Sequence, residues 1–447
     1  MNWLNLSPLL TDLYELTMAQ VYVEREMLAP ATFSLFVRKL PRRRSFLLAA
    51  GLGPLLEALE KLRFSEEDLA YLESLKLFKP TFLDYLRQFR FTGEIWALPE
   101  GTVFFENEPV LEVTAPLPEA QLIETLAINL INVETAVATK AARCVLAARG
   151  RACVDFGARR THGLEASLHA ARASYVAGFT ATSNVLAGKL FGIPVTGTMA
   201  HSFVESFPTE AEAFRAFAEN FPERTVFLID TYDTLRGAEV AAQVARELAA
   251  RGIYVRGVRL DSGNVIELSR EVRRLLDEAG LPEIKIFVSG GLDEEKIAEI
   301  VESGAPVEAF GVGTKMGVSA DAPYLDLAYK LVEYDGRPRM KLSEGKLTYP
   351  GRKQVFRRRD VAGVFYEDEL GLREEDLPGE PLLRCFMKEG RLLSRPPALS
   401  EIRQYAAEQL RYLPADIREG RRTPNPRISK KLAELRQRTE EALRRGN

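Results

Sequence analysis

The chain has 447 residues, of which 46% are hydrophobic and 28% are charged. At about 150 residues per domain, this length predicts two to four domains, and the hydrophobic content excludes wholesale disorder. The 60 basic and 63 acidic residues leave a formal charge of −3. The overall charge therefore gives no reason to expect nucleic acid as the main partner.

Three cysteines, Cys144, Cys153 and Cys385, show no CxxC spacing. This spacing argues against both a disulfide framework and a thiolate zinc site. We see no uninterrupted apolar stretch of about 18 residues, and no basic stretch followed by an apolar run at the N-terminus. We therefore expect a reduced, soluble, cytoplasmic protein without a membrane partner.

Residues 1–120 predict a mixed α/β domain, and a connecting helix follows. Apolar residues at helical spacing from Leu10 to Val21 predict the first helix. Residues 119–149 lack Pro and Gly and predict a long helix with room for one break. The other expected elements are a strand at 31–37, helices at 52–62, 66–75 and 80–89, and strands at 93–97, 102–105 and 110–113.

From residue 151, short apolar runs alternate with helical stretches, one pair in roughly every 25–40 residues, as parallel β/α units do. Six successive units favour a barrel over an open sheet. We therefore predict a β/α barrel domain over 121–345, with 121–150 as the connecting helix. The expected strands are 152–156, 193–196, 225–229, 254–260, 284–288 and 307–312, and the expected helices are 164–177, 182–191, 211–217, 235–251, 264–279 and 293–303.

The alternating pattern ends near Tyr349, and residues 346–447 predict a charged, partly helical C-terminal segment. Its last 33 residues carry ten Lys or Arg against five Asp or Glu. Because the two signs are mixed and aromatic residues are absent, a solvated helix is favoured over a nucleic-acid-binding tail.

The predicted strands end in polar residues, while their bodies are mostly apolar. In a β/α barrel, the loops that leave the C-terminal ends of the strands share one face, where active sites are built. All six strand ends offer small, cationic, acidic or nucleophilic side chains, which predicts one catalytic rim. These ends are residues 155–163, 197–202, 230–234, 259–263, 289–293 and 311–316.

Two successive strand ends are rich in glycine, around Gly290-Gly291 and Gly313-Thr314. Glycine lets backbone N–H groups approach an anion closely, and the N-terminus of the following helix adds partial positive charge. Each loop alone is equally compatible with a tight turn. Two in succession favour a phosphate-binding site.

Charged residues also follow the strands. Arginines there offer charge-assisted hydrogen bonds to phosphate or carboxylate, although each is compatible with a structural ion pair. Acids there suit Mg²⁺, which takes few carboxylates alongside substrate phosphates, or sugar hydroxyls. They are equally compatible with helix N-caps, above all Asp233. These residues are Arg159, Arg160, Arg259, Asp230, Asp233 and Asp261.

The chain has three histidines, His162, His169 and His201. His169 falls inside a predicted helix and is interpreted as structural, whereas His162 lies beside two arginines, where an anion site is conceivable. His201 follows Gly-Thr at a strand end and is the best-placed nucleophile or base. A hydrogen-bonded loop histidine is the alternative interpretation.

At these residues the chain resembles the nicotinate phosphoribosyltransferase family, over about residues 8–355. The matching pieces occur in the family's order, which makes a chance match improbable. They are LTDLYELTMAQ (10–20), DFGARRTHG (155–163), GFTATSNVLAG (178–188), GTMAHSFV (197–204), DTYDT (230–234), GVRLDSGN (257–264), VSGGLD (288–293), FGVGTKM (310–316), YKLVE (329–333) and PRMKLSEGKLTYPGRKQVF (338–356).

The resemblance implies an N-terminal α/β sandwich joined to an atypical, incomplete β/α barrel, in a homodimer with active sites at the subunit interface. It implies the transfer of a phosphoribosyl group from 5-phosphoribosyl 1-pyrophosphate to nicotinate, the entry step of NAD salvage. ATP and Mg²⁺ are the implied cofactors, and ATP is hydrolysed through a phosphohistidine. The residue that matches this phosphohistidine is His201.

Roles for other residues follow from matching positions. Phe156 resembles one wall of a sandwich around the nicotinate ring, and Tyr14 of the neighbouring subunit resembles the other. Arg259 resembles a contact of the nicotinate carboxylate. The further residues implied are Thr198 for nicotinate, Arg159 for the phosphoribosyl part, Asp261 for ribose hydroxyls and catalysis, Gly290, Gly291, Gly313 and Thr314 for the 5′-phosphate, and Asp230 and Ser289 as additional substrate contacts; metal ligands are not assigned.

Three alternatives are weighed against this function. Nicotinamide phosphoribosyltransferases place an acid near the ring amide, whereas Gly178–Gly188 contains no Asp or Glu. Quinolinate phosphoribosyltransferases are much shorter and need more basic residues for a second ring carboxylate. A non-catalytic protein that binds phosphoribosyl compounds is disfavoured by the intact His201, Asp261 and glycine loops.

Overall fold

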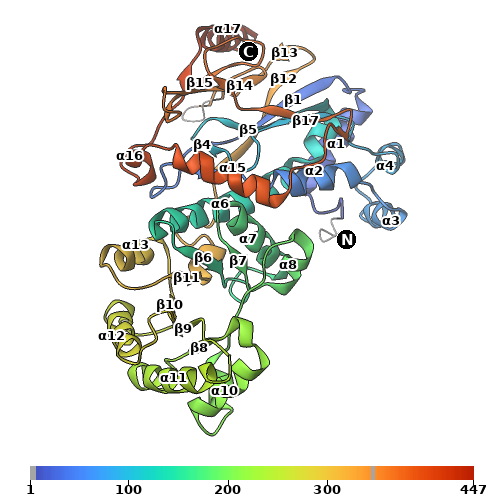
Figure 1. Cartoon of the computed structure of the whole chain (residues 1–447). Coiled ribbons are helices and arrows are strands. Elements are labelled where there is room, and N and C mark those ends of the chain that lie inside the picture. Colours follow the sequence, from blue (N-terminus) through green and yellow to red (C-terminus); the bar gives the residue numbers. More distant parts are fainter. Residues whose placement is uncertain (1–6, 344–347, 447) are drawn as a thin grey trace. The chain divides into compact units, whose positions relative to one another are not determined.

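The structure is a computed structural model that describes residues 7–343 and 348–446 (Figure 1). The chain divides into two compact units. We call residues 1–139 together with 321–447 the discontinuous unit, and residues 140–320 the inserted unit. Residues 344–347 interrupt the family-like stretch 338–356, and both they and the predicted boundary at 345/346 lie outside the described residues.

An antiparallel sheet of seven described strands forms the centre of the discontinuous unit. Its strand β1 is buried at seven of eight positions, as expected for a central strand covered on both faces. From one edge of the sheet to the other, the strands are β13 (Arg337–Pro338), β12 (Leu327–Tyr334), β1 (Pro30–Val37), β5 (Pro109–Pro116), β3 (Glu94–Ala97), β17 (Arg384–Lys388) and β18 (Arg391–Leu392).

Two smaller sheets and a set of helices complete this unit. One sheet has the order β16 (Glu380–Pro381), β14 (Lys353–Arg359), β15 (Phe365–Leu372) and β19 (Arg427–Ile428), and the other pairs β2 (Leu47–Leu48) with β4 (Val103–Phe104). The helices are α1 (Leu13–Glu24), α2 (Leu52–Lys61), α3 (Glu66–Ser74), α4 (Pro80–Arg87), α5 (Leu117–Leu122), α15 (Leu399–Arg411), α16 (Ala415–Arg418) and α17 (Lys430–Gly446), and α6 (Glu124–Ala148) continues into the inserted unit.

The C-terminal segment belongs to the discontinuous unit and is more ordered than its charged sequence suggested. Strand β17 pairs with β3, with Arg384 opposite Ala97. The basic terminal helix expected from the sequence is α17, and its Leu432 is fully buried against the apolar core of this unit. The three ranges proposed from the sequence, 1–120, 121–345 and 346–447, therefore differ from the two units of the structure.

The long helical stretch Leu117–Ala148 has one break, at Ile123 between α5 and α6. By length and a mean hydropathy of 1.3 this stretch is apolar enough to cross a membrane, although charged residues interrupt it. However, 67% of its most apolar window is buried within the structure. Core helices pass the same test, so the stretch is weak evidence for a membrane span.

The inserted unit contains a six-stranded parallel sheet of described strands in the order β7-β6-β11-β10-β9-β8. Chain-consecutive strands are neighbours except for β7 and β8, and the first strand β6 also pairs with the last strand β11. This is the strand order of a β/α barrel in which one pair of neighbours, β7 and β8, is not joined. The predicted incomplete β/α barrel is therefore confirmed. The strands are β6 (Ala152–Asp155), β7 (Ala181–Thr182), β8 (Val226–Leu228), β9 (Gly257–Leu260), β10 (Lys285–Val288) and β11 (Ala309–Val312).

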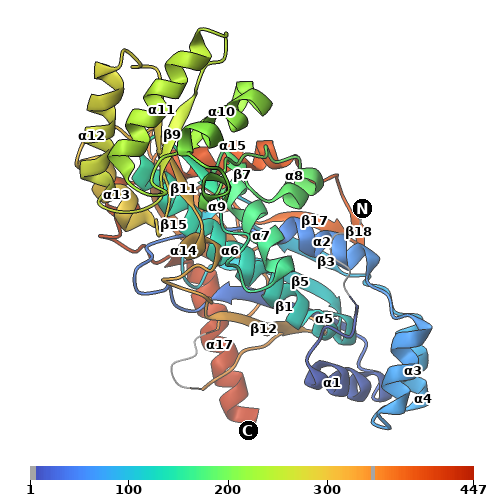
Figure 2. The same cartoon turned by 90° about the horizontal axis from the view of Figure 1, so that it is seen from below.

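Helices follow these strands as the alternating pattern predicts (Figures 1 and 2). In α12, buried residues recur at Val265, Ser269, Val272 and Leu276, one face of a helix against the sheet. The helices are α7 (Leu164–Val176), α8 (Val185–Phe191), α9 (His201–Glu205), α10 (Glu210–Asn220), α11 (Thr234–Ala249), α12 (Val265–Glu278), α13 (Glu294–Glu302) and α14 (Thr314–Gly317), with a 3₁₀ turn at Pro222–Arg224.

One predicted strand is wrong. Residues 193–196 form only a single parallel bridge, between Val195 and Thr182. The strand that does form here, β7, covers Ala181–Thr182 and begins where a helix had been expected. A two-residue strand leaves too little periodicity to be recognised from sequence.

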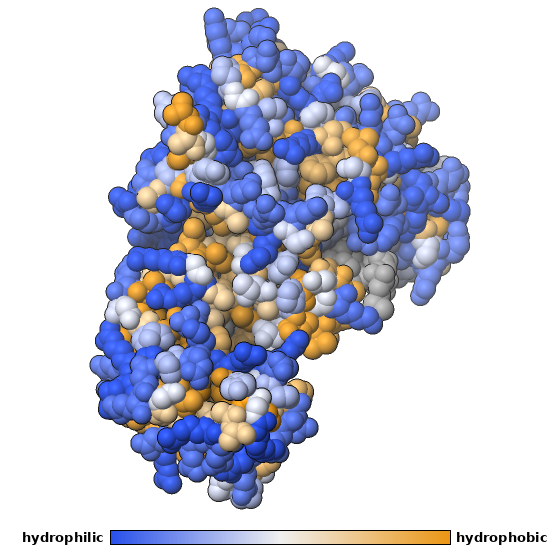
Figure 3. Space-filling model, viewed as in Figure 1, coloured by the Kyte–Doolittle hydropathy of each residue, from blue (hydrophilic) through white to orange (hydrophobic). Residues whose placement is uncertain are grey.

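Polar residues cover most of the face drawn in Figure 3, with apolar patches between them. The apolar core of the inserted unit contains the stacked rings of Phe214 and Phe227, whose centroids are 4.6 Å apart. This ring pair packs α10 against strand β8 of the sheet.

Candidate active site

A cavity of about 610 Å³ lies at the C-terminal ends of the parallel strands in the inserted unit. Ligand pockets typically measure about 300–1,000 Å³. Of the residues assigned to the site from sequence, all but Tyr14 and Asp230 are among the described residues that line this cavity. The lining residues are Phe156, Ala158, Arg159, Arg160, Ser183, Gly197, Thr198, Met199, Ala200, His201, Arg259, Asp261, Ser289, Gly290, Gly291, Gly311, Gly313 and Thr314.

Arg259 is the centre of the polar network in the cavity. Its Nη1 donates to Oδ1 of Asp261 at 3.3 Å and to Oγ of Ser289 at 3.2 Å, and its Nη2 donates to the carbonyl of Met199 at 2.7 Å. The Ser289 hydroxyl in turn donates to Asp261. These bonds join β9, β10 and the loop before His201, so the guanidinium is held in place before any ligand arrives.

Two atoms of this network have unused hydrogen-bonding capacity. Nε of Arg259 and Oδ1 of Asp230 are buried and have no hydrogen-bond partner among the described residues. The other oxygen of Asp230, Oδ2, accepts from the Asp261 backbone N–H at 2.8 Å and from the Ser262 hydroxyl at 2.7 Å. Unpaired buried polar atoms are costly, so these two are candidates for pairing with a bound ligand.

The strand-end glycines are required by close contacts. Gly290 has φ of +86°, and a Cβ atom there would lie 2.0 Å from the carbonyl oxygen of Asp261. A Cβ atom on Gly311 would lie 2.6 Å from the ring of Phe156. Glycine is therefore needed at both positions for the loop and the ring to lie where they do.

His201 is the first residue of α9 and lines the cavity. Its Nδ1 shares a hydrogen bond of 3.2 Å with Oγ1 of Thr231, which follows β8. Of the other two histidines, His162 is exposed and His169 is buried in α7. Of the three histidines, His201 is thus the one that lines the cavity, and its hydrogen bond to Thr231 orients the ring.

Comparison with known proteins matches both parts of the chain. Residues 9–132 match the model of the nicotinate phosphoribosyltransferase N-terminal domain, and residues 151–346 match the model of the nicotinate phosphoribosyltransferase family. The chain belongs to the nicotinate phosphoribosyltransferase family. The predicted family resemblance is therefore confirmed.

Individual relatives agree with this assignment. A nicotinate phosphoribosyltransferase of Mycobacterium tuberculosis is 52% identical over 92% of this chain and 88% of its own length. The Bacillus subtilis nicotinate phosphoribosyltransferase is 39% identical over 90% of this chain and 88% of its own length. The crystal structure of human nicotinic acid phosphoribosyltransferase superposes with a TM-score of 0.86 at 32% identity, and covers 96% of this chain and 99% of that one.

Asp155 is a member of the family-like motif DFGARRTHG to which the sequence assigned no role. Its Oδ1 accepts from the Gly157 N–H and its Oδ2 from the Thr182 hydroxyl, both at 2.7 Å. Burial raises the pKa of Asp155, and these two hydrogen bonds oppose the shift. Asp155 therefore fixes the loop that carries Phe156, and its place as the last residue of a strand was the available signal.

The remaining site residues differ in how they are held. Arg159 and Arg160 are exposed at the cavity. Arg259 is mostly buried, and burial lowers its pKa, although the Asp261 and Asp230 carboxylates oppose that shift. Arginine stays protonated at physiological pH all the same.

Tyr14 lies on α1 of the discontinuous unit and is 44% exposed, and its pairing with a site of the neighbouring subunit stays a prediction.

No group of three or more His, Cys, Asp or Glu side chains suited to a metal ion occurs among the described residues. Mg²⁺ does not require such a group, because it is held through one or two carboxylates, waters and substrate phosphates. The unpartnered Oδ1 of Asp230 fits that sparse set of ligands.

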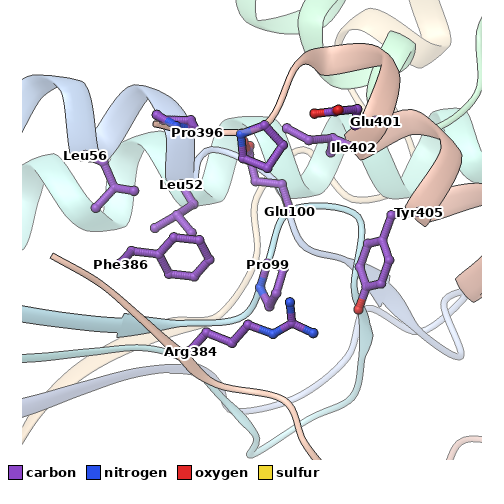
Figure 4. Close-up of a pocket in the computed structure, with 12 residues that line it drawn as sticks. Leu52, Leu56, Pro99, Glu100, Arg384, Phe386, Pro396, Glu401, Ile402 and Tyr405 are labelled. Atoms are coloured by element: carbon purple, nitrogen blue, oxygen red, sulfur yellow. The ribbon is translucent and has the colours of Figure 1, made fainter. Parts of the chain in front are cut away.

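A second cavity, of about 190 Å³, lies within the discontinuous unit. Figure 4 shows Leu52 and Leu56 beside Phe386 on one side of it, with Arg384 and Tyr405 on another. Among the described residues that line this cavity, none was assigned to the site from sequence. Its walls are largely apolar, and Glu100 and Glu401 add acidic groups that disfavour a phosphate.

Proposed function

We propose that this protein joins nicotinate to 5-phosphoribosyl 1-pyrophosphate, giving nicotinate mononucleotide and pyrophosphate, and couples this reaction to ATP hydrolysis through a phosphohistidine at His201. The observation that carries the proposal is the single cavity that Arg259, Asp261, His201 and the two glycine loops share. Membership of the nicotinate phosphoribosyltransferase family supports the same transfer, a step of NAD salvage.

The sugar phosphate is assigned to the glycine loops. Gly290, Gly291 and Gly313 line the cavity, and backbone N–H groups of glycine loops are suited to binding a phosphate. Asp261, whose side chain is 35% exposed, is available to ribose hydroxyls. Ser289 and Arg259 hold its Oδ1, so the carboxylate is oriented before the sugar binds.

Nicotinate is assigned to the part of the cavity between Phe156, Thr198 and Arg259. Arg259 has an unpaired N–H at Nε, and Nη2 has a second N–H besides the one donated to the Met199 carbonyl. These two donors are suited to a carboxylate. Ser183 also lines the cavity and is neutral. A neutral residue here suits a ring carboxylate better than an acidic residue does, because it adds no like charge.

In the transfer step, the C1–O bond to pyrophosphate breaks and the ring nitrogen of nicotinate forms the new bond to C1. The electron pair of the broken bond leaves with pyrophosphate. Arg159, exposed at the cavity, is positioned to stabilise the charge that accumulates on the leaving group. Bound Mg²⁺, held by Asp230 and Asp261 together with substrate oxygens, would neutralise part of that charge.

The ATP-dependent part of the proposal rests on the ring of His201. A ring nitrogen of His201 attacks the γ-phosphorus of ATP, the bond to the bridging oxygen breaks, and ADP leaves. Water later hydrolyses the phosphoramidate. The phosphate on His201 adds negative charge to the cavity and changes its affinity for pyrophosphate relative to substrate.

The test is a comparison of ring bases. Pyrophosphate release is measured with nicotinate, nicotinamide or quinolinate, with and without ATP. We expect release with nicotinate, stimulation by ATP, and little release with the other two. Release with nicotinamide at an equal rate would favour the nicotinamide enzyme, and no release with any ring would favour a binding protein.

The proposal also includes a homodimer with shared sites, in which Tyr14 serves the cavity of its neighbour. Tyr14→Ala and His201→Asn are each expected to lack ATP-stimulated activity. Mixing the two and allowing subunits to exchange should restore about a quarter of the wild-type ATP-stimulated activity, because half of the dimers then contain one intact site. No restoration in mixed dimers would contradict a shared site.

A further inference from the structure

The two glycine loops leave neighbouring strands. Strands β10 and β11 pair in parallel, with Val288 opposite Phe310, and Gly290 and Gly313 follow just beyond their ends. Both loops line the cavity. A phosphate bound by the two loops together needs their separation to be fixed, and strand pairing fixes it only up to the strand ends.

Asp293 connects the two loops. It is the N-cap of α13, and its Oδ1 accepts from the Lys296 backbone N–H at 2.9 Å. Its Oδ2 accepts from Nζ of Lys315 at 2.6 Å, and Lys315 lies on α14, directly after Gly313 and Thr314. One carboxylate therefore holds both the helix that follows the first loop and the helix that follows the second.

The environment of this ion pair favours a fixed geometry. The side chain of Asp293 is 13% exposed, so the pair is shielded from solvent on the carboxylate side. Burial acts to raise the pKa of Asp293, but the hydrogen bonds from Lys315 and Lys296 outweigh it and hold the pKa below its usual value. The carboxylate is thus charged at neutral pH.

The neighbouring residue anchors the same helix on another side. Glu294 is buried and pairs with Lys140 at 2.6 Å and with Arg143 at 2.9 Å, both on α6. The N-terminus of α13 is therefore immobilised, and Asp293 is a fixed point from which Lys315 can position the second loop.

We propose that the Asp293–Lys315 ion pair sets the spacing of the two glycine loops and so positions them for the 5′-phosphate of the sugar substrate. This assignment rests on the proposed function for the identity of the sugar phosphate. Neither Asp293 nor Lys315 is among the described residues that line the cavity, so we assign both as positioning residues.

Removing the charge of Asp293 distinguishes a positioning role of the ion pair from direct phosphate binding by Lys315. Replacing Asp293 by Asn keeps the N-cap, since Asn caps helices as well as Asp does, but it removes the acceptor and the charge that hold Lys315. If Lys315 acted as a phosphate ligand restrained by Asp293, Asp293→Asn would release its ammonium and tighten anion binding. If the pair sets loop spacing, the same substitution weakens binding despite the added positive charge.

The experiment is calorimetric titration of the full-length protein with ribose 5-phosphate, together with steady-state kinetics. We expect Asp293→Asn and Lys315→Met each to weaken binding about tenfold, comparable to the loss of outer partners of metal ligands. The KM for 5-phosphoribosyl 1-pyrophosphate should rise by the same factor at nearly constant kcat. The double variant should be no weaker than either single variant.

Lys296→Met is the matched control, because its ammonium pairs with Glu299 on the exposed face of α13 and its backbone N–H stays capped. It should bind ribose 5-phosphate like the wild type. Unchanged or tighter binding by Asp293→Asn, or additive losses in the double variant, would overturn the assignment. The titration needs no turnover, so a wild type that bound ribose 5-phosphate but made no nicotinate mononucleotide would contradict the proposed function alone.

Discussion

The two units use charged residues in opposite ways. In the discontinuous unit, Lys353 and Glu112 form an ion pair of 3.0 Å whose side chains are 5% and 0% exposed. Two backbone carbonyls, at Gly351 and Tyr349, accept further hydrogen bonds from the same ammonium. In the cavity of the inserted unit, Arg259 and Asp261 are 3.3 Å apart, and the carboxylate is 35% exposed.

The difference between these pairs is in what remains unpaired. The Lys353 ammonium bonds Glu112 and two backbone carbonyls, so removing it should destabilise the folded protein. Arg259 keeps an unpaired Nε and Asp230 an unpaired Oδ1, so these groups retain capacity for a ligand. Substitutions of charged residues in the two regions should therefore show their effects in different assays, activity or stability. Arg259 and Lys353 test this contrast, and two smaller changes in the cavity, at His201 and Ser183, sharpen it.

The largest effect is expected in the cavity, from Arg259→Met. This change removes the donor to Asp261, Ser289 and the Met199 carbonyl, and kcat/KM for nicotinate should fall about 10³-fold, the factor that corresponds to roughly 4 kcal/mol. Steady-state kinetics measures it, with urea unfolding as the check on folding. Arg259→Lys keeps the charge without the planar fork and should be only partly active. If kcat/KM fell less than tenfold in Arg259→Met, Arg259 would not be a nicotinate-binding residue.

The counterpart in the discontinuous unit is Lys353→Met. Glu112 then keeps Arg373 as a cationic partner, but the bonds of the ammonium to Glu112 and to two backbone carbonyls are lost, so the free energy of unfolding should fall by about 3 kcal/mol. Urea denaturation measures this change, while ring-base selectivity stays that of the wild type. The control is Lys61→Met, which removes an exposed pair with Glu57 and should cost less than about 0.5 kcal/mol. Equal stabilities for the two variants would contradict the comparison.

His201→Asn should act on the ATP-dependent rate alone. Asparagine has no ring nitrogen to accept a phosphoryl group, so the ATP-stimulated rate should fall about 10²-fold, to the rate without ATP. Nicotinate mononucleotide formation with and without ATP measures this, and ³²P transfer from ATP to the protein should disappear. Full stimulation by ATP in the variant would show that the phosphoryl group is carried elsewhere.

The smallest effect is expected from Ser183→Asp, which changes specificity. A carboxylate placed at this cavity-lining position repels the nicotinate carboxylate and offers an acceptor to an amide. The preference for nicotinate over nicotinamide should fall about tenfold, or roughly 1.4 kcal/mol. The ratio of kcat/KM values measures it, and neutral Ser183→Asn should keep the wild-type preference.

The sequence predicts the inserted unit well because its strands follow a simple rule. The run 284–288 is mostly apolar and short, as a buried strand should be, and β10 begins one residue after the expected start and ends at the expected residue, with Ile286 and Val288 buried. The strands of the C-terminal segment were missed because charges hide them. Arg357 in β14 and Asp368 in β15 are both buried and neutralise each other across the sheet, which composition cannot show.

The candidate site was predicted through strand ends, and its internal bonding was not. Gly290, Arg259 and His201 follow apolar runs, a signal available from the sequence alone. That Ser289 bonds both Arg259 and Asp261 depends on the parallel register, in which Val288 is opposite Leu260. Thr231 lies in the predicted strand end 230–234, but its bond to His201 could not be predicted, because that bond arises only where the loop after β8 meets α9.

The pairing of β17 with β3 has a consequence for biosynthesis. Strand β3 ends at Ala97, whereas its partner begins at Arg384. At 5–20 residues per second, a ribosome needs roughly 15 to 60 seconds to reach that partner. During this time the edge of β3 is without its neighbour, whereas residues 140–320 emerge as one uninterrupted stretch. Any nascent-chain chaperone that protects this protein should therefore be needed at β3 and released only as translation finishes.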